Sequence, residues 1–149
     1  MTTRVGLSIL LATSLAVVLT PGNLGSLRAS SACSNATLHG SYAIHATGYL
    51  VSAAPSPVAL VGAFTYDGVG GGTANVQQRI NGVTSPVNVS GTYVVEADCS
   101  MTDTLGGSTH FAEIFDHGNR FFILNTTVGA PNVVSGEGRR QSEGDRDQN

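Results

Sequence analysis

The chain has 149 residues, of which 41% are hydrophobic and only 11% are charged, and its formal net charge is −3. All seven basic residues are arginines, and the segment 33–136 holds only Arg79 and Arg120 against six carboxylates. Because phosphate binding needs clustered Lys or Arg, this composition argues against a nucleic-acid partner and against docking on an anionic membrane.

The first 32 residues are typical of a secretory signal peptide. A short basic start, ending at Arg4, precedes an apolar run from Val5 to Leu19. This run is shorter than the about 20 residues that span a bilayer, but long enough for the centre of a signal peptide. Small residues at Ser30-Ser31-Ala32 predict cleavage before Cys33, and hence a secreted or periplasmic protein with no membrane contact after cleavage. The alternative is a lipoprotein acylated on Cys33, which Ser30 disfavours because the bacterial lipobox usually has Leu there.

The mature chain has the size of one domain, which we place at 33–141, followed by a polar tail at 142–149. The segment Glu137–Asn149 is dense in charge and has no apolar residue, so we expect its end to be disordered. In an exported domain the two cysteines, Cys33 and Cys99, most simply form one disulfide. Two free thiols in a metal or redox site are the alternative, but the sequence has no CxxC pair or nearby His cluster.

The rest of the chain alternates short β-rich runs with turn signals. The expected strands are 41–51, 58–66, 73–80, 87–97, 100–105, 109–115, 120–127 and 133–139. Asp67-Gly68 and Asn81-Gly82 are strong hairpin signals, and Asp116–Asn119 is a further turn. Eight short strands with short links predict an all-β protein, an eight-stranded antiparallel up-and-down barrel, because closure removes exposed sheet edges. A two-layer sandwich is the alternative.

Three glycines followed two positions later by an aromatic residue start or lie within these runs. Together with the segments around the cysteines and near the C-terminus, they resemble a group of exported bacterial proteins in the allene oxide cyclase barrel-like family. The segments that carry the resemblance are Cys33–Tyr42, Gly62–Gly68, Gly91–Tyr93, Asp98–Ser100 and Ser135–Gln141.

This resemblance implies an eight-stranded antiparallel barrel with a central pocket. Plant members fold a fatty-acid-derived epoxide into a ring, and related bacterial barrels close polyketide rings. The matching residues are turn and strand-start residues, so they point to the fold, and no catalytic residue of those enzymes maps onto them.

Glu113 is the candidate catalytic residue. It lies between Phe111 and Phe115 on one face of the sixth expected strand. If that face points inward, an apolar pocket raises the pKa of the carboxyl group, as a general acid or base near neutrality requires. If it points outward, Glu113 is solvated and His110, Ala112 and Ile114 face the core. A ligand pocket would also include the aromatic residues Tyr42, Phe64, Tyr93, Phe111 and Phe115.

Other polar residues give weaker signals. His45 alternates with an apolar set and is expected at the surface. Glu96 and Asp98 share a face and could coordinate a hard cation, but no third acidic ligand is near in sequence, so we expect them to face solvent. His110 and His117 lack zinc-site spacing. The sequence therefore predicts no metal and no cofactor.

Four consecutive apolar residues, Phe121–Leu124, predict a strand buried on both faces. One face would line the barrel, and the other would meet either the loop 51–57 or a second subunit in a homodimer.

Two function classes remain open from sequence. In one, the barrel holds a small apolar molecule and carries it or promotes its cyclisation or isomerisation. In the other, the interior is filled and the domain is a non-catalytic extracellular structural or interaction module.

Overall fold

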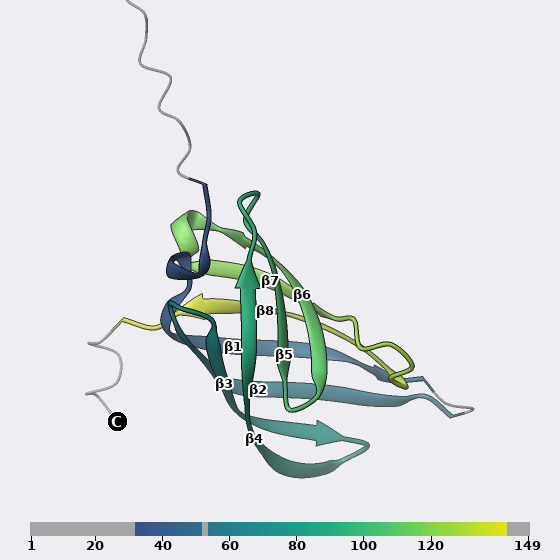
Figure 1. Cartoon of the computed structure of the whole chain (residues 1–149). Helices are drawn as coiled ribbons and strands as arrows, with labels where there is room; N and C mark the ends of the chain where they lie inside the picture. Colours follow the sequence, from purple (N-terminus) through teal and green to yellow (C-terminus); the bar gives the residue numbers. More distant parts are fainter. Residues whose placement is uncertain (1–31, 52–53, 143–149) are drawn as a thin grey trace, which may run out of the picture. The chain divides into compact units, whose positions relative to one another are not determined.

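The computed structural model describes residues 32–51 and 54–142. Within these ranges the chain forms a closed barrel of eight antiparallel strands, each paired with the next in sequence, and the last is paired with the first (Figure 1). The strands are β1 (His39–Leu50), β2 (Ser56–Asp67), β3 (Gly71–Ile80), β4 (Val83–Val95), β5 (Ser100–Leu105), β6 (Ser108–Phe115), β7 (Arg120–Asn125) and β8 (Asn132–Arg140). The predicted barrel is confirmed and a two-layer sandwich is excluded, because β1 and β8 close the sheet.

Residues along each strand point alternately into and out of the barrel, as a pleated strand requires. In β1, Tyr42, Ile44 and Ala46 are buried, while Ala43 and His45 between them are exposed. The expected surface position of His45 is therefore confirmed. Glu96 and Asp98 are also exposed, as expected, in the segment between β4 and β5.

The predicted hairpin signals mark real turns. Asn81 and Gly82 join β3 to β4, and both have positive φ, of 46° and 85°. Such a pair of left-handed residues matches the twist of a two-residue hairpin and is the reason for the Asn-Gly preference. The strand bounds differ from the expected ones by a few residues, most of all in β4, which begins at Val83 rather than at residue 87.

One end of the barrel is closed and filled. Two 3-10 helices, η1 (Asn35–Thr37) and η2 (Asp116–Gly118), lie at this end (Figure 1). Side chains packed beneath them include Leu38, Tyr42, Tyr66, Tyr93, Met101 and Phe121, each at most 2% exposed. The tyrosines also fix the helices, since Tyr93 Oη donates to the carbonyl of Leu38 at 3.0 Å and Tyr42 Oη to that of Gly118 at 2.8 Å.

The predicted disulfide joins Cys33, just before η1, to Cys99 in the turn between β4 and β5. Their Cα atoms are 5.0 Å apart, and the backbone N–H of Cys33 donates to the carbonyl of Ala97 at 3.3 Å. The start of the described chain is thereby fastened to the closed end of the barrel.

The other end is open because the strands differ in length. β4 has 13 residues, but only Gly91–Val95 pair with β5, whereas Val83–Thr92 pair with β3. The β3–β4 hairpin therefore extends beyond the shorter strands β5 and β7, each of six residues. Inward side chains of this extension, among them Gln78, Val87 and Val89, line a cavity at the open end together with residues of β1, β2, β7 and β8.

Candidate functional site

A carboxylate lies inside the barrel. Asp103, in the middle of β5, is 1% exposed and is the only charged residue among the buried residues that the structure describes. Its neighbours on the same face, Met101 and Leu105, are buried and apolar. Because burial of an unpaired charge is costly, Asp103 requires partners at this position.

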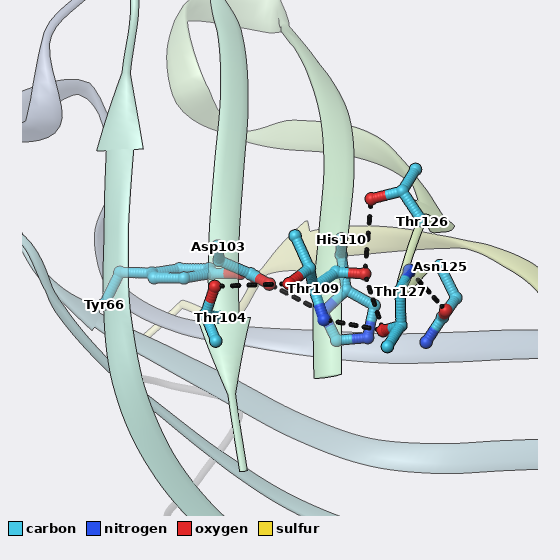
Figure 2. A network of polar contacts seen from close by, with 8 residues as sticks. All are labelled: Tyr66, Asp103, Thr104, Thr109, His110, Asn125, Thr126 and Thr127. Carbon is cyan, nitrogen blue, oxygen red and sulfur yellow. Dashed lines mark hydrogen bonds and ion pairs between the residues drawn. The ribbon is translucent and has the colours of Figure 1, made fainter. Parts of the chain in front are cut away.

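Two partners meet Asp103, one at each carboxylate oxygen. Tyr66 Oη donates to Oδ2 at 2.8 Å, and Nδ1 of His110 lies 2.6 Å from Oδ1. His110 is directly opposite Asp103 in the antiparallel pairing of β5 and β6, so the sheet register itself brings the two together. Figure 2 shows Tyr66, Asp103 and His110 in a row across three strands.

The contact with Asp103 indicates which nitrogen of His110 is free. An ionised carboxylate can only accept hydrogen bonds, so with Asp103 ionised we assign the proton of His110 to Nδ1, which donates it to Oδ1. Nε2 is left with its lone pair, and within the described part of the chain it has no hydrogen-bond partner. The His110 side chain is 17% exposed, and it borders the cavity at the open end.

Tyr66 stays protonated over a wide pH range. Burial raises the pKa of its phenol group well above the ordinary value, and the neighbouring Asp103 carboxylate raises it further. The phenol therefore remains a hydrogen-bond donor to Asp103. Together, Tyr66 and Asp103 hold the His110 ring in one orientation.

The cavity has a volume of about 170 Å³. It shares lining residues with a smaller space of about 50 Å³ deeper in the barrel. Both are bordered by Leu60, Phe64, Val76, His110, Asn125 and Val134. Most of these side chains are apolar, so His110 is a rare titratable group on an apolar wall.

A few further polar groups line the larger space. Asn125 is directly opposite His110 in the β6–β7 pairing, and its Oδ1 accepts from the backbone N–H of Thr127 at 3.1 Å. This bond leaves the amide nitrogen of Asn125 without a protein partner in the described ranges (Figure 2). At the mouth, Oδ1 of Asn132 is buried and has no hydrogen-bond partner among the described residues.

The five predicted pocket residues fall into three groups. Phe64 lines the cavity, as predicted. Tyr42 and Tyr93 point into the barrel but belong to the filled, closed end rather than to the cavity lining. Phe111 and Phe115 lie on the outward-facing side of β6, so the prediction that they line the pocket is wrong.

Of the two orientations that the sequence left open for Glu113, the structure has the outward one, so this candidate catalytic residue does not face the interior. Glu113 is exposed, whereas Ala112 and Ile114 on either side of it are buried. The alternation of β6 therefore follows the outward alternative, with His110 on the inner face. Glu113 lies in a shallow, open groove of about 530 Å³ on the outside of the barrel, beside Phe111 and Phe122. Such a groove keeps its carboxyl group in water.

The predicted burial of both faces of Phe121–Leu124 is wrong as well. Phe121 and Ile123 point into the barrel and are buried, but Phe122 is 55% and Leu124 is 42% exposed. No part of the loop 51–57 that the structure describes lies among the residues lining the groove over them. The homodimer stays a prediction.

Sequence reasoning missed Asp103, although the signal was present. In β5, Met101, Asp103 and Leu105 alternate with Thr102 and Thr104, which places the aspartate on the apolar face. A carboxylate on the apolar face of a strand needs a buried partner, and His110 and Tyr66 could have been sought among the inward positions of other strands.

The described residues form no cluster of metal-binding side chains. Among residues 32–51 and 54–142, no three His, Cys, Asp or Glu side chains gather where they could bind a metal ion. Nor does this part of the chain form a helix of the length and apolarity needed to cross a membrane.

Comparison with known proteins gives no relative from which a role could be transferred: no protein-family model, no curated protein and no solved structure matches this chain. A function can therefore be inferred only from the geometry of the barrel. The disulfide bears on location, because such bonds persist in non-reducing surroundings.

Proposed function

We propose that the barrel binds a small, mainly apolar molecule with one polar group in the cavity at its open end. The observation that carries this proposal is the free Nε2 of His110 on a mainly apolar wall. An apolar pocket with a few convergent polar groups is the usual form of a small-molecule site.

The size of the cavity limits the ligand. Drug-sized ligands occupy pockets of about 300–1,000 Å³, whereas this cavity holds about 170 Å³. A cavity of about 150 Å³ in another protein takes up benzene. The expected ligand is therefore comparable to a single six-membered ring, or a larger molecule of which one end enters the barrel while the rest stays outside the mouth.

The polar atoms indicate where the ligand would be hydrogen-bonded. Nε2 of His110 accepts a proton from a hydroxyl or acidic C–H group, and the amide nitrogen of Asn125 donates to a carbonyl or ether oxygen. Oδ1 of Asn132, buried without a partner, would accept from a donor near the mouth, which removes the cost of an unsatisfied buried acceptor.

The cavity would also suit an enzyme that promotes cyclisation or isomerisation, as the resemblance to allene oxide cyclase barrels implies. We further propose that the protein is secreted or periplasmic, because the disulfide supports a non-reducing location and the first 32 residues resemble a signal peptide. These 32 residues fall almost wholly outside the described ranges, as does the tail after Ser142.

A pair of adjacent substitutions tests the binding site. Leu60 borders the cavity, and Val61, the next residue along β2, is 59% exposed on the outer surface. Leu60→Phe fills the cavity, so we expect it to weaken binding of cyclohexanone by about tenfold, or about 1.4 kcal/mol. Val61→Phe adds a ring of the same size outside the barrel and should leave binding unchanged.

Binding is measured by the NMR chemical shifts of the full-length protein during titration with cyclohexanone. Shifts confined to cavity residues such as Phe64 and Val76 in the unmodified protein would support the proposal. An absence of binding by cyclohexanone and by similar small ring compounds would contradict it and would favour the alternative, a structural or interaction module.

A further inference from the structure

We infer that His110 is a general base that moves a proton on a small carbonyl compound bound in the cavity, with Asn125 as the donor to the carbonyl oxygen. This inference rests on the proposed function, because it needs a ligand in the cavity. It goes further, since it assigns an isomerase-type activity and gives roles to His110 and Asn125 in the chemistry and to Asp103 and Tyr66 in positioning.

The state of His110 suits a base. Asp103 accepts the Nδ1 proton at 2.6 Å, so the unprotonated nitrogen is Nε2, the one not held by the carboxylate. When Nε2 takes up a proton, the imidazolium that forms lies against the buried carboxylate of Asp103, which stabilises it. This arrangement is the one that a histidine needs as a base: one nitrogen anchored by a carboxylate, the other free.

Asp103 is itself held in place. Its other oxygen accepts from Tyr66 Oη at 2.8 Å, and Tyr66 is 1% exposed among the packed aromatic rings of the closed end. The carboxylate therefore cannot rotate away from His110 without leaving the phenol unsatisfied. Tyr66 and Asp103 are positioning residues in this scheme, because neither of them borders the cavity.

A hydrogen-bond donor lies beside His110 on the neighbouring strand β7. Asn125 pairs with His110 across β6 and β7, and both line the cavity. The backbone N–H of Thr127 donates to Oδ1 of Asn125. The amide nitrogen of Asn125 is therefore the group that can donate a hydrogen bond to a ligand. A base and an N–H donor thus lie on adjacent strands, facing the same space.

These groups suit a carbonyl compound with an acidic C–H bond. For a β,γ-unsaturated ketone, Nε2 of His110 removes a proton from the carbon between the carbonyl and the double bond. The C–H electron pair forms a new C=C bond, and the carbonyl π electrons move to the oxygen, which the Asn125 N–H stabilises. The proton then returns from Nε2 to the γ-carbon, the carbonyl reforms and the double bond is conjugated. No atom or electron is gained or lost, and no co-reactant is needed.

The experiment uses the full-length protein and the β,γ-unsaturated isomer of cyclohexenone, a single-ring ketone. Formation of the conjugated enone is followed by ultraviolet absorbance, and binding is followed separately by chemical shifts of cavity residues such as Phe64. We expect catalysis by the unmodified protein and a loss of about 100-fold or more in His110→Gln, since general base catalysis contributes about 10²–10⁴-fold. His45→Gln, which removes an exposed histidine on the outside of β1, should react at the unmodified rate.

A second measurement starts from the unmodified protein, where it depends neither on activity nor on the folding of a variant. Nitrogen NMR of the unmodified protein reports the tautomer of His110, and we expect the proton on Nδ1. In Asp103→Asn, whose amide can donate to Nδ1, we expect the proton to move to Nε2 together with a fall in the isomerisation rate, whereas a merely structural role of Asp103 would not change the tautomer.

The outcomes separate the two proposals. If the ketone binds in the cavity but is not isomerised above the background rate, or if His110→Gln isomerises it as fast as the unmodified protein, the base role is overturned while the binding site stands. A proton on Nε2 of His110 in the unmodified protein would also overturn the base role. If the cavity residues show no shifts with this ketone or with cyclohexanone, the proposed function itself fails.

Discussion

The ring of Phe121 occupies the space above Gly138. The two residues are directly opposite each other in the pairing of β7 and β8, and a Cβ at Gly138 would overlap the ring carbons of Phe121. Phe121 is fully buried, and its ring also contacts Tyr42 and Tyr66, with ring centroids 5.4 and 6.1 Å apart. A glycine in β8 thus allows the aromatic cluster of the closed end to form.

The first prediction follows from this contact. Gly138→Ala forces either the ring or the strand to move, so we expect a loss of about 1–3 kcal/mol in the free energy of unfolding, the usual cost of overpacking. Urea denaturation monitored by circular dichroism gives this value. In the background of Phe121→Leu, where the ring is gone, the same change should cost clearly less. Equal stability of Gly138→Ala and the unmodified protein would contradict the described packing.

The glycines also show what sequence reasoning could achieve for the fold. Turn signals such as Asn81-Gly82 and the period of two along each strand depend only on local residues, so the strand number and order could be predicted. The role of Gly138, in contrast, could not be predicted. That it makes room for Phe121 depends on the register between β7 and β8, which no local pattern contains.

The second prediction concerns the disulfide. Cys33 and Cys99 are separated by 66 positions, and a cross-link over such a loop restricts the unfolded chain by roughly 4 kcal/mol as an upper estimate. We expect Cys33→Ser with Cys99→Ser to lower the free energy of unfolding by a few kcal/mol at most. Thermal unfolding of this double variant, and of the unmodified protein with and without reductant, measures the loss. A double variant that equals the oxidised protein in stability would contradict the prediction.

The candidate site was harder to predict than the fold, for a physical reason. Glu113 was preferred because its neighbours at two-residue spacing are aromatic, yet large apolar residues also occur on the outside of this barrel. Because apolar residues occur on both faces of β6, the alternation does not show which face is inside. Only the pairing with β5 and β7 decides this. Asp103 and His110 become a site only when that register places them opposite each other.

The third prediction concerns stability in acid. Oδ1 of Asp67 accepts from the backbone N–H groups of Val69, Gly70 and Gly71, at 2.8, 2.9 and 2.9 Å. These bonds lower the pKa of the carboxyl group in the folded state. A lowered folded pKa gives a stabilisation that is present above the unfolded value of about 3.9 and is lost as the pH falls towards the folded value.

We therefore expect Asp67→Asn to reduce the dependence of unfolding free energy on pH below about pH 4, because the amide cannot titrate. Urea denaturation at a series of acidic pH values compares the two slopes. Asp98 has a lowered pKa from separate hydrogen bonds to the backbone and side chain of Ser100, so Asp98→Asn should remove an independent part of the slope. An unchanged slope in Asp67→Asn would contradict the role of the turn.

The last prediction concerns stability in alkali and depends on the buried tyrosines. Burial raises the pKa of Tyr66 well above its ordinary value, with the carboxylate of Asp103 as the next cause, and burial also raises the pKa of Tyr42 and of Tyr93. A raised folded pKa gives a stabilisation that is fully present below the unfolded value of about 10 and is lost as the pH rises from there towards the folded value.

Above about pH 10, each such tyrosine should therefore lower the free energy of unfolding by up to about 1.4 kcal/mol per pH unit, because its phenol ionises in the unfolded chain first. Tyr66→Phe removes one of these groups and should make the alkaline slope less steep, although the loss of the hydrogen bond to Asp103 lowers stability at neutral pH. Tyrosinate absorbance in the folded protein gives a direct check, since Tyr66 should ionise only as the barrel unfolds. Ionisation of Tyr66 at about pH 10 in the folded protein would show that its phenol is not buried against Asp103, and the anchoring of His110 would then lose its support.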